Sequence, residues 1–459
     1  MEDVIELFKP GQKGSKNYRI PSLLVSNEGT LLAAIDKRNQ HQSDWGNIDI
    51  AMRRSFDHGK SWTDDKVIID LKSNPNVSGE HHSAFLIDVS MVQDRISNRI
   101  FLLVDMFCES KGFFSVGSDN DTMKTPYVEI DGSNKLLLRH EEGHFYYLEE
   151  DGKVFTLNDR KDSGMHVIVE SNHPTFNDLG DLYKDNTYLG NIYLDYTATP
   201  IKAKATVYLW LTYSDDDGAT WASPKDITKQ VRQDWMEFIG TGPGLGIQLE
   251  NNNLLFPVYT TNQHKGYSQS SSMIRSKDFG ENWEFLDSTN NRYVNNEKIS
   301  PMTLKNLDYI TTESQAVLLN SGTLKLFMRN YTGKVLVANS HDGGETWLDD
   351  FDKLDITDVY VQLSVIHTIR NKKEYILLAN ASGPERNNGT LKLLEVNPDD
   401  SLTLISETLI HKGRYEYNCL AELKDGNFAI FFEHPSEQYD GDMTMMFRRF
   451  SFEDLISNI

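Results

Sequence analysis

One eight-residue motif occurs four times in the chain, and its repetition constrains the fold more than any other feature. The copies are SFDHGKSW at 55–62, SDDDGATW at 214–221, SKDFGENW at 276–283 and SHDGGETW at 340–347. Each copy follows an apolar, β-prone run, and Asp and Gly are the residues that tight hairpin turns require. We therefore predict four equivalent hairpin turns, each with a Trp that packs back over the turn.

The second copy raises the alternative of a calcium site, because it places three carboxylates together. An EF-hand alignment centred on Gly218 puts Tyr213 at the first ligand position and Pro224 at the last, where Asp and Glu are needed. The other three copies lack two of the three acids. The motif is therefore interpreted as a turn and not as a metal or catalytic centre.

A second repeat is a hairpin of apolar strand, Asn/Asp/Gly turn and apolar strand. It occurs six times, at residues 18–36, 87–105, 244–259, 313–329, 362–380 and 417–433. The first four hairpins are each followed by one copy of the eight-residue motif. Each hairpin, followed by a loop and a further pair of strands joined by a turn, has the form of a propeller blade. The sequence therefore predicts an all-β fold, a six-bladed β-propeller.

The spacing of the motifs also locates an insertion. They begin at residues 55, 214, 276 and 340, so the first interval exceeds the others by roughly 95 residues. The excess contains short β-prone runs joined by DG and EDG turns. We predict a small inserted β-rich domain at 112–205, with the propeller formed by 1–111 and 206–459.

Aligning the hairpins on their turns brings chemically active residues into one register. The first strands of four blades open on Arg19, Asp88, Glu313 and Tyr417, and the return strands end on Asp36, Asp105, Tyr259, Arg329 and Glu433. Loops leaving the same end carry Arg38, Asp44 and Arg386. Because the innermost strands line the channel of a propeller, we expect these side chains to converge at one of its ends.

The charges of the chain and of these converging residues leave two interpretations of them open. The net charge of −22 argues against nucleic acid or an anionic membrane as the main partner. Several arginines at one end nevertheless indicate an anionic ligand, because a guanidinium fork matches a carboxylate with two hydrogen bonds. The alternative is a polar plug, in which the arginines pair with Asp36, Glu313 and Glu433.

Compartment and cofactor signals are sparse. Cys108 and Cys419 lie far apart with no CxxC pattern, so we expect two buried thiols and no disulfide. No apolar run reaches the length of a membrane span, and the N-terminus lacks the apolar segment of a signal peptide. We expect a cytoplasmic protein if the sequence is the native full chain, and a secreted or cell-surface one if it is a trimmed catalytic region.

At this point the sequence resembles a known family. YRIP at 18–21 is similar to the F/Y-R-I-P signature of bacterial sialidases (exo-α-neuraminidases), and the eight-residue motif to their Asp box. TES at 312–314, FMR at 327–329 and YN at 417–418 follow in the same order. The resemblance covers nearly the whole chain and is strongest to the large sialidases with a domain inserted in a six-bladed catalytic propeller.

The resemblance implies a role for each matching residue. Tyr417 would be the nucleophile, Glu313 its base, and Asp44 the acid/base. The substrate carboxylate would bind to Arg19, Arg329 and Arg386, and the rest of the sugar to Arg38, Asp88 and Tyr259. A neutral phenol suits this substrate, because the anomeric carbon already bears a carboxylate that would repel an anionic nucleophile.

The implied activity is removal of terminal α-linked sialic acid with retention, by a monomer acting on sialylated glycans or glycoproteins without a cofactor or metal. One alternative is an intramolecular trans-sialidase that releases 2,7-anhydro-sialic acid. Another, of a different class, is a non-catalytic glycan-binding propeller.

Three other signals receive structural interpretations. The glycine-rich segment GTGPGLGI at 240–247 fits no nucleotide-binding pattern, and we expect a tight loop at the channel mouth. His81 and His82 are adjacent without metal-ligand spacing, so we expect ordinary loop histidines. Cys419 lies two residues beyond Tyr417, and we expect a packed thiol there and not a nucleophile.

Overall fold

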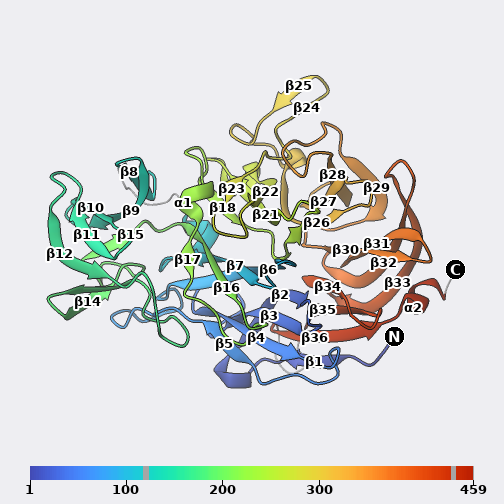
Figure 1. Cartoon of the computed structure of the whole chain (residues 1–459), viewed down its shortest axis with the longest axis horizontal. Coiled ribbons are helices and arrows are strands. Elements are labelled where there is room, and N and C mark those ends of the chain that lie inside the picture. The colour runs from blue at the N-terminus through green and yellow to red at the C-terminus, as the bar shows by residue number, and fades with distance from the viewer. Residues whose placement is uncertain (117–123, 436–440, 458–459) are drawn as a thin grey trace.

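The computed structural model of the chain describes residues 1–116, 124–435 and 441–457, and the rest of the predicted propeller and insertion ranges lies outside the described residues. Six antiparallel sheets surround a common centre (Figure 1), and the innermost strands of neighbouring sheets contact one another. The predicted six-bladed β-propeller is confirmed. Blades are numbered here in chain order.

The first three blades contain the following strands. Blade 1 is β2 (Asn17–Val25), β3 (Leu31–Arg38), β4 (Ile48–Ser55) and β5 (Lys66–Ile69). Blade 2 is β6 (Phe85–Gln93), β7 (Ile100–Phe107), β16 (Val207–Ser214) and β17 (Lys225–Asp226). Blade 3 has β18 (Phe238–Thr241) and β20 (Ile247–Gln248) against β21 (Leu254–Thr261), then β22 (Ser270–Ser276) and β23 (Glu284–Phe285).

The last three blades are regular four-stranded sheets. Blade 4 is β26 (Thr311–Leu318), β27 (Leu324–Asn330), β28 (Lys334–Ser340) and β29 (Asp352–Thr357). Blade 5 is β30 (Ser364–Arg370), β31 (Lys373–Ala381), β32 (Asn387–Val396) and β33 (Leu402–Arg414). Blade 6 is β34 (Asn418–Glu422), β35 (Phe428–Pro435), β36 (Met443–Phe450) and β1 (Ile5–Phe8).

Short elements connect the blades. These are β19 (Gly244–Leu245), the hairpin of β24 (Arg292–Val294) and β25 (Glu297–Ile299), the helices α1 (Thr228–Val231) and α2 (Phe452–Ile456), and the 3-10 turns η1 (Gln12–Gly14), η2 (Gly112–Ser115), η3 (Lys265–Ser268) and η4 (Leu307–Tyr309). No helix in the described part of the chain is long and apolar enough to span a membrane.

The two ends of the chain close the ring. Strand β1 is the outermost strand of blade 6 and pairs with β36, with Ile5 opposite Phe447. The amino group of Met1 also forms an ion pair with Asp454 in α2. Blade 6 therefore combines N-terminal and C-terminal segments, so neither end can unfold without disrupting a sheet.

The four repeated motifs form equivalent turns between the third and fourth strands of blades 1 to 4. In the second copy, the Asp216 carboxylate accepts hydrogen bonds from the backbone N–H of Thr220 at 2.8 Å and from the Ser214 hydroxyl at 2.8 Å. The Gly218 N–H donates to the Ser214 hydroxyl at 2.9 Å. The carboxylate therefore satisfies backbone groups of its own turn, as predicted.

The expectation of a loop at 240–247 is wrong. Residues on both sides of Pro243 belong to strands: β18 and β20 form the inner edge of blade 3, and β19 pairs in parallel with β6 at the inner edge of blade 2. The glycines let this edge lie very close to its neighbours: a Cβ on Gly246 would lie 2.4 Å from the carbonyl oxygen of Leu255, and one on Gly240 2.5 Å from the carboxylate of Asp105. The glycines therefore serve close backbone approach and not a turn.

A separate sheet lies between β7 and β16. Its strands are β8 (Tyr127–Ile130), β9 (Ser133–His140), β10 (Phe145–Leu148), β11 (Lys153–Thr156), β12 (Asp162–Val167), β13 (Asp181–Lys184), β14 (Thr187–Asn191) and β15 (Ile201–Ala203). It projects to the left of the propeller in Figure 1. The division into two domains at residues 112 and 205 stays a prediction.

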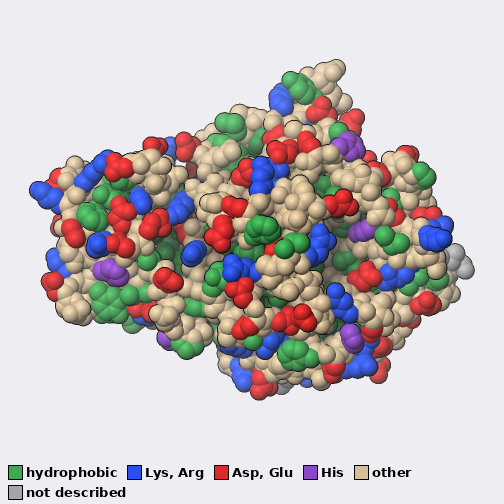
Figure 2. Space-filling view, in the orientation of Figure 1, with side chains coloured by type: hydrophobic (Ala, Val, Ile, Leu, Met, Phe, Trp, Pro, Cys, Tyr) green, Lys and Arg blue, Asp and Glu red, His purple; other side chains and the backbone are tan. Residues whose placement is uncertain are grey.

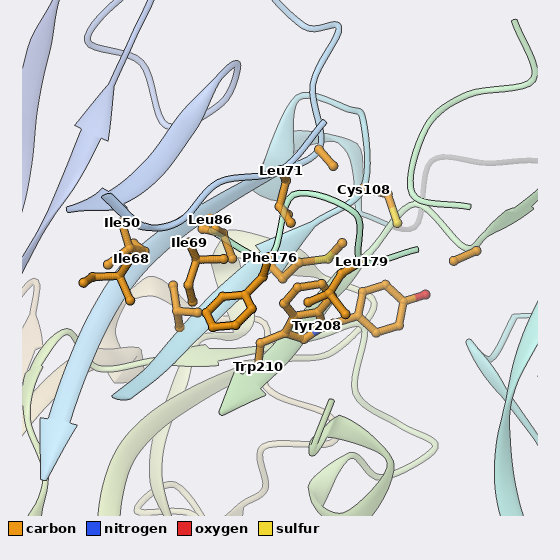
Figure 3. Close-up of a cluster of buried hydrophobic side chains, with 14 of the residues drawn as sticks. Ile50, Ile68, Ile69, Leu71, Leu86, Cys108, Phe176, Leu179, Tyr208 and Trp210 are labelled. Atoms are coloured by element: carbon orange, nitrogen blue, oxygen red, sulfur yellow. The ribbon is translucent and has the colours of Figure 1, made fainter. Parts of the chain in front are cut away.

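The inserted sheet is attached to the propeller by buried apolar side chains. Phe176 and Leu179 of the insertion belong to one cluster with Tyr208 and Trp210 of blade 2 and Ile68 of blade 1 (Figure 3). Burial of such side chains contributes roughly 1.5–3 kcal/mol each, so this contact holds the insertion in place. Acidic and basic side chains are interspersed over both parts on the face shown in Figure 2.

Candidate active site

Three of the predicted residues stand at β-bulges on inner strands. The pairing register shifts between Arg19 and Ser22 in blade 1, between Ile87 and Ser90 in blade 2, and between Thr311 and Ser314 in blade 4. A bulge inserts a residue and turns the local side chains out of the regular alternation. The bulges thus lie beside Arg19, Asp88 and Glu313, the residues that the hairpin register singled out.

These side chains border one cavity of about 430 Å³ at the end of the propeller. Eight of the nine predicted site residues line it: Arg19, Asp44, Asp88, Tyr259, Glu313, Arg329, Arg386 and Tyr417. The ninth, Arg38, is fully buried and reaches the site through the carboxylate of Asp44. The structure therefore brings the predicted residues together at one cavity.

Tyr417, Glu313 and Arg329 form a connected triad. The Tyr417 hydroxyl donates to Glu313 Oε1 at 2.6 Å, and Arg329 Nη1 donates to Glu313 Oε2 at 2.5 Å and to the Tyr417 oxygen at 3.0 Å. Burial raises the pKa of Tyr417 well above its ordinary value, and the Glu313 carboxylate adds to the rise. The phenol is therefore neutral at rest, with an acceptor in place for its proton.

Arg19 and Arg386 are joined by a carboxylate that sequence reasoning missed. Glu416 accepts from Arg386 Nη1 at 2.6 Å and from Arg19 Nη2 at 3.2 Å. Burial alone would raise the pKa of Glu416, but Arg19 and Arg386 outweigh it and hold the pKa at about 2. Glu416 directly precedes Tyr417, and adjacency to a predicted nucleophile is the only signal in the sequence that could have found it.

Glu433 fixes Arg19 and the strand that carries Tyr417. It accepts two bonds from Arg19, at 3.1 Å from both Nε and Nη2. The backbone N–H groups of Ile20 and Tyr417 also donate to this carboxylate, at 2.9 and 3.1 Å. One buried acid therefore ties the bulge of blade 1 to blade 6, and it keeps the Arg19 guanidinium at the cavity wall.

Asp44 stands at the rim of the cavity on the loop between β3 and β4. Arg38 Nη1 donates to Asp44 Oδ1 at 2.7 Å, and Arg19 Nη1 lies 3.7 Å from the same oxygen. Burial opposes ionisation, but the guanidinium groups of Arg38 and Arg19 outweigh it and hold the pKa of Asp44 below its ordinary value. The Asp44 side chain is 58% exposed, so it is accessible from the cavity mouth.

The floor of the cavity holds buried acids beside an aromatic wall. Burial raises the pKa of Asp88 and of Asp105 well above the ordinary value, and each carboxyl is close enough to other acids to raise it further. Tyr259 lies beside them and packs on Phe238, with ring centroids 5.0 Å apart. Burial among other acids therefore favours the protonated form of both carboxyls, and that form can donate a hydrogen bond.

An aromatic rim borders the cavity mouth. Phe113 and Phe114 come from η2, and Tyr331 and Tyr360 lie next to Arg329. The Tyr331 and Tyr360 rings are stacked with centroids 3.8 Å apart, and the Arg329 guanidinium lies 3.9 Å from the Tyr360 centroid. Sequence reasoning missed all four residues; Tyr331, two residues after Arg329, is the only one that the hairpin register could have indicated.

Both earlier interpretations of the arginines describe part of the site. Arg19 pairs with Glu433, Arg38 with Asp36 and Arg329 with Glu313, as the polar-plug alternative required. An open cavity nevertheless remains in front of Arg19, Arg329 and Arg386. The ion pairs therefore orient the guanidinium groups without filling the space before them.

Comparison with known proteins agrees with this geometry. The BNR repeat-like domain family matches residues 20–394. The anhydrosialidase of Macrobdella decora is 28% identical over 480 aligned residues, which cover 93% of this chain and 59% of the relative. Sialidase B of Streptococcus pneumoniae is 26% identical, over 93% of this chain and 63% of its own length. The chain thus spans about three fifths of these relatives.

Solved structures show the same fold over the full length. The intramolecular trans-sialidase of Ruminococcus gnavus matches with a TM-score of 0.78 at 23% identity, covering 98% of both chains. The leech intramolecular trans-sialidase gives a TM-score of 0.79 at 24% identity, covering 99% of this chain and 71% of the other. The chain therefore belongs to the BNR repeat-like domain family, among the bacterial-type sialidases that these relatives represent.

Proposed function

We propose that this protein is a retaining exo-sialidase that hydrolyses terminal α-linked sialic acid from glycoconjugates through a sialyl-tyrosine intermediate. The observation that carries the proposal is the 2.6 Å hydrogen bond from the Tyr417 hydroxyl to Glu313, at the base of a cavity bordered by three arginines. A phenol that is hydrogen-bonded to an acid, next to guanidinium groups that line the cavity, suits a sugar whose anomeric carbon bears a carboxylate. The names of the curated relatives support the same substrate class.

The arginines would hold the substrate carboxylate. Arg19, Arg329 and Arg386 each keep a cavity-facing edge while another edge binds a protein acid. Because those acids are fixed, the guanidinium planes are oriented before substrate enters, and little entropy is lost on binding. Their charge would also draw an anionic sugar into a protein of net charge −22.

Bond formation and bond cleavage would then be shared among three residues. The Tyr417 oxygen attacks the anomeric carbon while its proton passes to Glu313, and the bond to the leaving glycan breaks. Asp44 donates its proton to the departing oxygen. In the second half, Asp44 as carboxylate deprotonates a water that attacks the anomeric carbon, and the Tyr417 oxygen leaves with the proton held by Glu313. Two inversions give net retention.

The lowered pKa of Asp44 fits this sequence once substrate is bound. In the free protein Arg38 and Arg19 favour the carboxylate, which is the wrong form for a general acid. A substrate carboxylate bound at Arg19 would cancel part of that positive field and raise the pKa of Asp44. Substrate binding thus prepares its own proton donor.

A second candidate is an intramolecular trans-sialidase that releases 2,7-anhydro-sialic acid. The observation in its favour is that the proteins similar to this chain include an anhydrosialidase and two intramolecular trans-sialidases. The same Tyr417, Glu313 and Asp44 would serve, with a hydroxyl of the bound sugar replacing water in the second half. The hydrolytic and transfer reactions therefore differ in product and not in catalytic residues.

One assay tests both candidates and the partner class. The folded protein is incubated with 3′-sialyllactose and with a fluorogenic aryl α-sialoside, and the released sugar is followed by proton NMR. Initial appearance of the α-anomer of free sialic acid supports retaining hydrolysis. Anhydro-sugar as the first product supports transfer. Binding of sialyllactose without release from either substrate would contradict both and favour a glycan-binding propeller.

A further inference from the structure

The loop that carries Asp44 is held by a cluster of three aromatic rings, in tilted and T-shaped contact, that does not line the cavity. Trp45 follows Asp44 directly, and its ring lies 4.3 Å from that of His41 and 4.3 Å from that of His81. His41 belongs to the same loop, whereas His81 belongs to the segment between β5 and β6. The indole therefore lies between two imidazoles that come from different connections of the propeller.

Backbone packing tightens the same contact. Gly46 lies so close to its neighbours that a Cβ there would be 2.8 Å from the carbonyl oxygen of Glu80 and 2.8 Å from His41 Nε2. On the other side, a Cβ on Gly112 would lie 2.9 Å from the carbonyl oxygen of Asp44. The segment with His81 and the residues that open η2 thus enclose the loop from two sides.

The Asp44 side chain has little support of its own. Its carboxylate is 58% exposed and is held by Arg38 at 2.7 Å, with Arg19 farther away at 3.7 Å. Arg38 also donates to the backbone oxygen of Gln42, so one guanidinium supports both the start of the loop and the carboxylate. Apart from the hydrogen bond between Arg38 and its carboxylate, the position of Asp44 depends on the residue that follows it, Trp45.

We propose that His81, in edge contact with the ring of Trp45, is a positioning residue for Asp44, and that it fixes the distance between this acid and the leaving oxygen of the substrate. The inference rests on the proposed function, because it assigns Asp44 the proton transfer. It gives His81 a role that sequence analysis did not foresee, since the histidine contributes an aromatic contact and neither a metal ligand nor a proton.

The consequence depends on the leaving group. Departure of a sugar alkoxide needs a proton from Asp44, whereas an aryl oxide such as 4-nitrophenolate leaves without one. General acid catalysis is worth about 10²- to 10⁴-fold, and it falls steeply when the acid is displaced. A variant that only loosens the Asp44 loop must therefore lose more activity on a natural sialoside than on an aryl sialoside.

The experiment compares kcat/KM for 3′-sialyllactose and for 4-nitrophenyl α-sialoside, because this constant reports formation of the covalent intermediate. We expect His81→Ala to lower kcat/KM for sialyllactose by about tenfold more than for the aryl substrate. Asp44→Ala should show the same selectivity to a greater degree. His81→Phe should restore wild-type values, because an aromatic ring against Trp45 is retained without the ionisable nitrogens.

The neighbouring His82 provides the matched control. His82→Ala changes a histidine of the same segment while it leaves the ring contacts of Trp45 intact, so both substrates should be turned over at wild-type rates. Equal losses of His81→Ala on the two substrates, or no loss, would overturn the positioning role. A wild-type protein that releases nothing from the aryl substrate would instead remove the proposed function, and this inference with it.

Discussion

The two ends of the blades use the same residue types for opposite purposes. At the turn end, Asp216 binds Ser214 and Thr220, which lie within four residues of it, and most of its surroundings are solvent. At the cavity end, Glu313 binds Arg329 and Tyr417, which lie 16 and 104 residues away, and it is buried. In this molecule, the carboxylate of the turn binds partners close to it in the sequence, whereas the carboxylate of the candidate site binds partners far from it in the sequence.

The first turn and the floor of the cavity also move the pKa of an aspartate in opposite directions. Hydrogen bonds from Ser61 hold the pKa of Asp57, in the first turn, at about 2. Burial raises the pKa of Asp88, at the cavity floor, well above its ordinary value. Local donors stabilise the ionised form, whereas burial among other acids stabilises the protonated form. Substitutions at the two ends should therefore separate stability from activity.

Replacement of the cavity hydroxyl should have the largest effect. We expect Tyr417→Phe to lower kcat/KM by 10³-fold or more, because no covalent intermediate can form, while the melting temperature changes little. Tyr415→Phe is the matched control: within the described residues the buried Tyr415 hydroxyl has no hydrogen-bond partner, so its loss should leave activity intact. Near-normal turnover by Tyr417→Phe would reject the assignment of the nucleophile.

Substitution of an arginine that lines the cavity should give the next largest effect. We expect Arg386→Lys to raise KM for a sialoside by about 10- to 100-fold with a smaller change in kcat, because an ammonium cannot form the two parallel hydrogen bonds of a guanidinium. Arg414→Lys is the control, since Arg414 also binds Glu416, at 2.7 Å, but does not line the cavity. Similar losses in the two variants would show that Glu416, and not the substrate, is the partner that matters.

The acid at the cavity rim should give a pH effect of moderate size. Asp44 acts while protonated, so activity is lost as pH rises through its pKa. Because Arg38 and Arg19 lower that pKa in the free protein and a bound carboxylate weakens their field, the alkaline limb of kcat should lie at higher pH than that of kcat/KM. Coincident limbs in the two pH profiles would contradict this coupling.

Sequence reasoning reached the blade count and the register because both depend on repetition. A turn that needs Asp and Gly at fixed positions recurs in recognisable form, and the distance along the strand from each turn then places Arg19, Asp88 and Glu313 at one end. Tyr360 escaped because its position follows from packing between blades, and Glu416 and Tyr331 have only their nearness in sequence to Tyr417 and Arg329 as a signal.

The one segment interpreted wrongly shows the limit of composition. Residues 240–247 are rich in glycine, and glycine is a common signal of a loop. Here Gly240 and Gly246 allow a strand to lie against Asp105 and Leu255 without room for a Cβ. Absence of a side chain has two physical uses, turning and close approach, and only the three-dimensional neighbours decide between them.

Substitutions at the turn end should reverse the pattern seen at the cavity. We expect Asp216→Ala to lower the free energy of unfolding by about 1 kcal/mol, because it removes the acceptor for Thr220 and Ser214, with kcat/KM unchanged. Asp215→Ala, which removes an exposed ion pair with Arg99, should cost less. A selective loss of kcat in Asp216→Ala without loss of stability would overturn the interpretation as a turn.

The smallest expected effect follows from the pKa of Asp57. Its folded-state pKa of about 2 is below the ordinary value, so the ionised carboxylate stabilises the fold above about pH 4, and this contribution is lost as pH falls towards 2. Asp57→Asn should therefore have a lower urea midpoint than wild type at pH 6, and the difference should shrink between pH 4 and pH 2. A constant difference across this range would mean that the amide and the carboxylate differ only in packing, because a shape difference does not titrate.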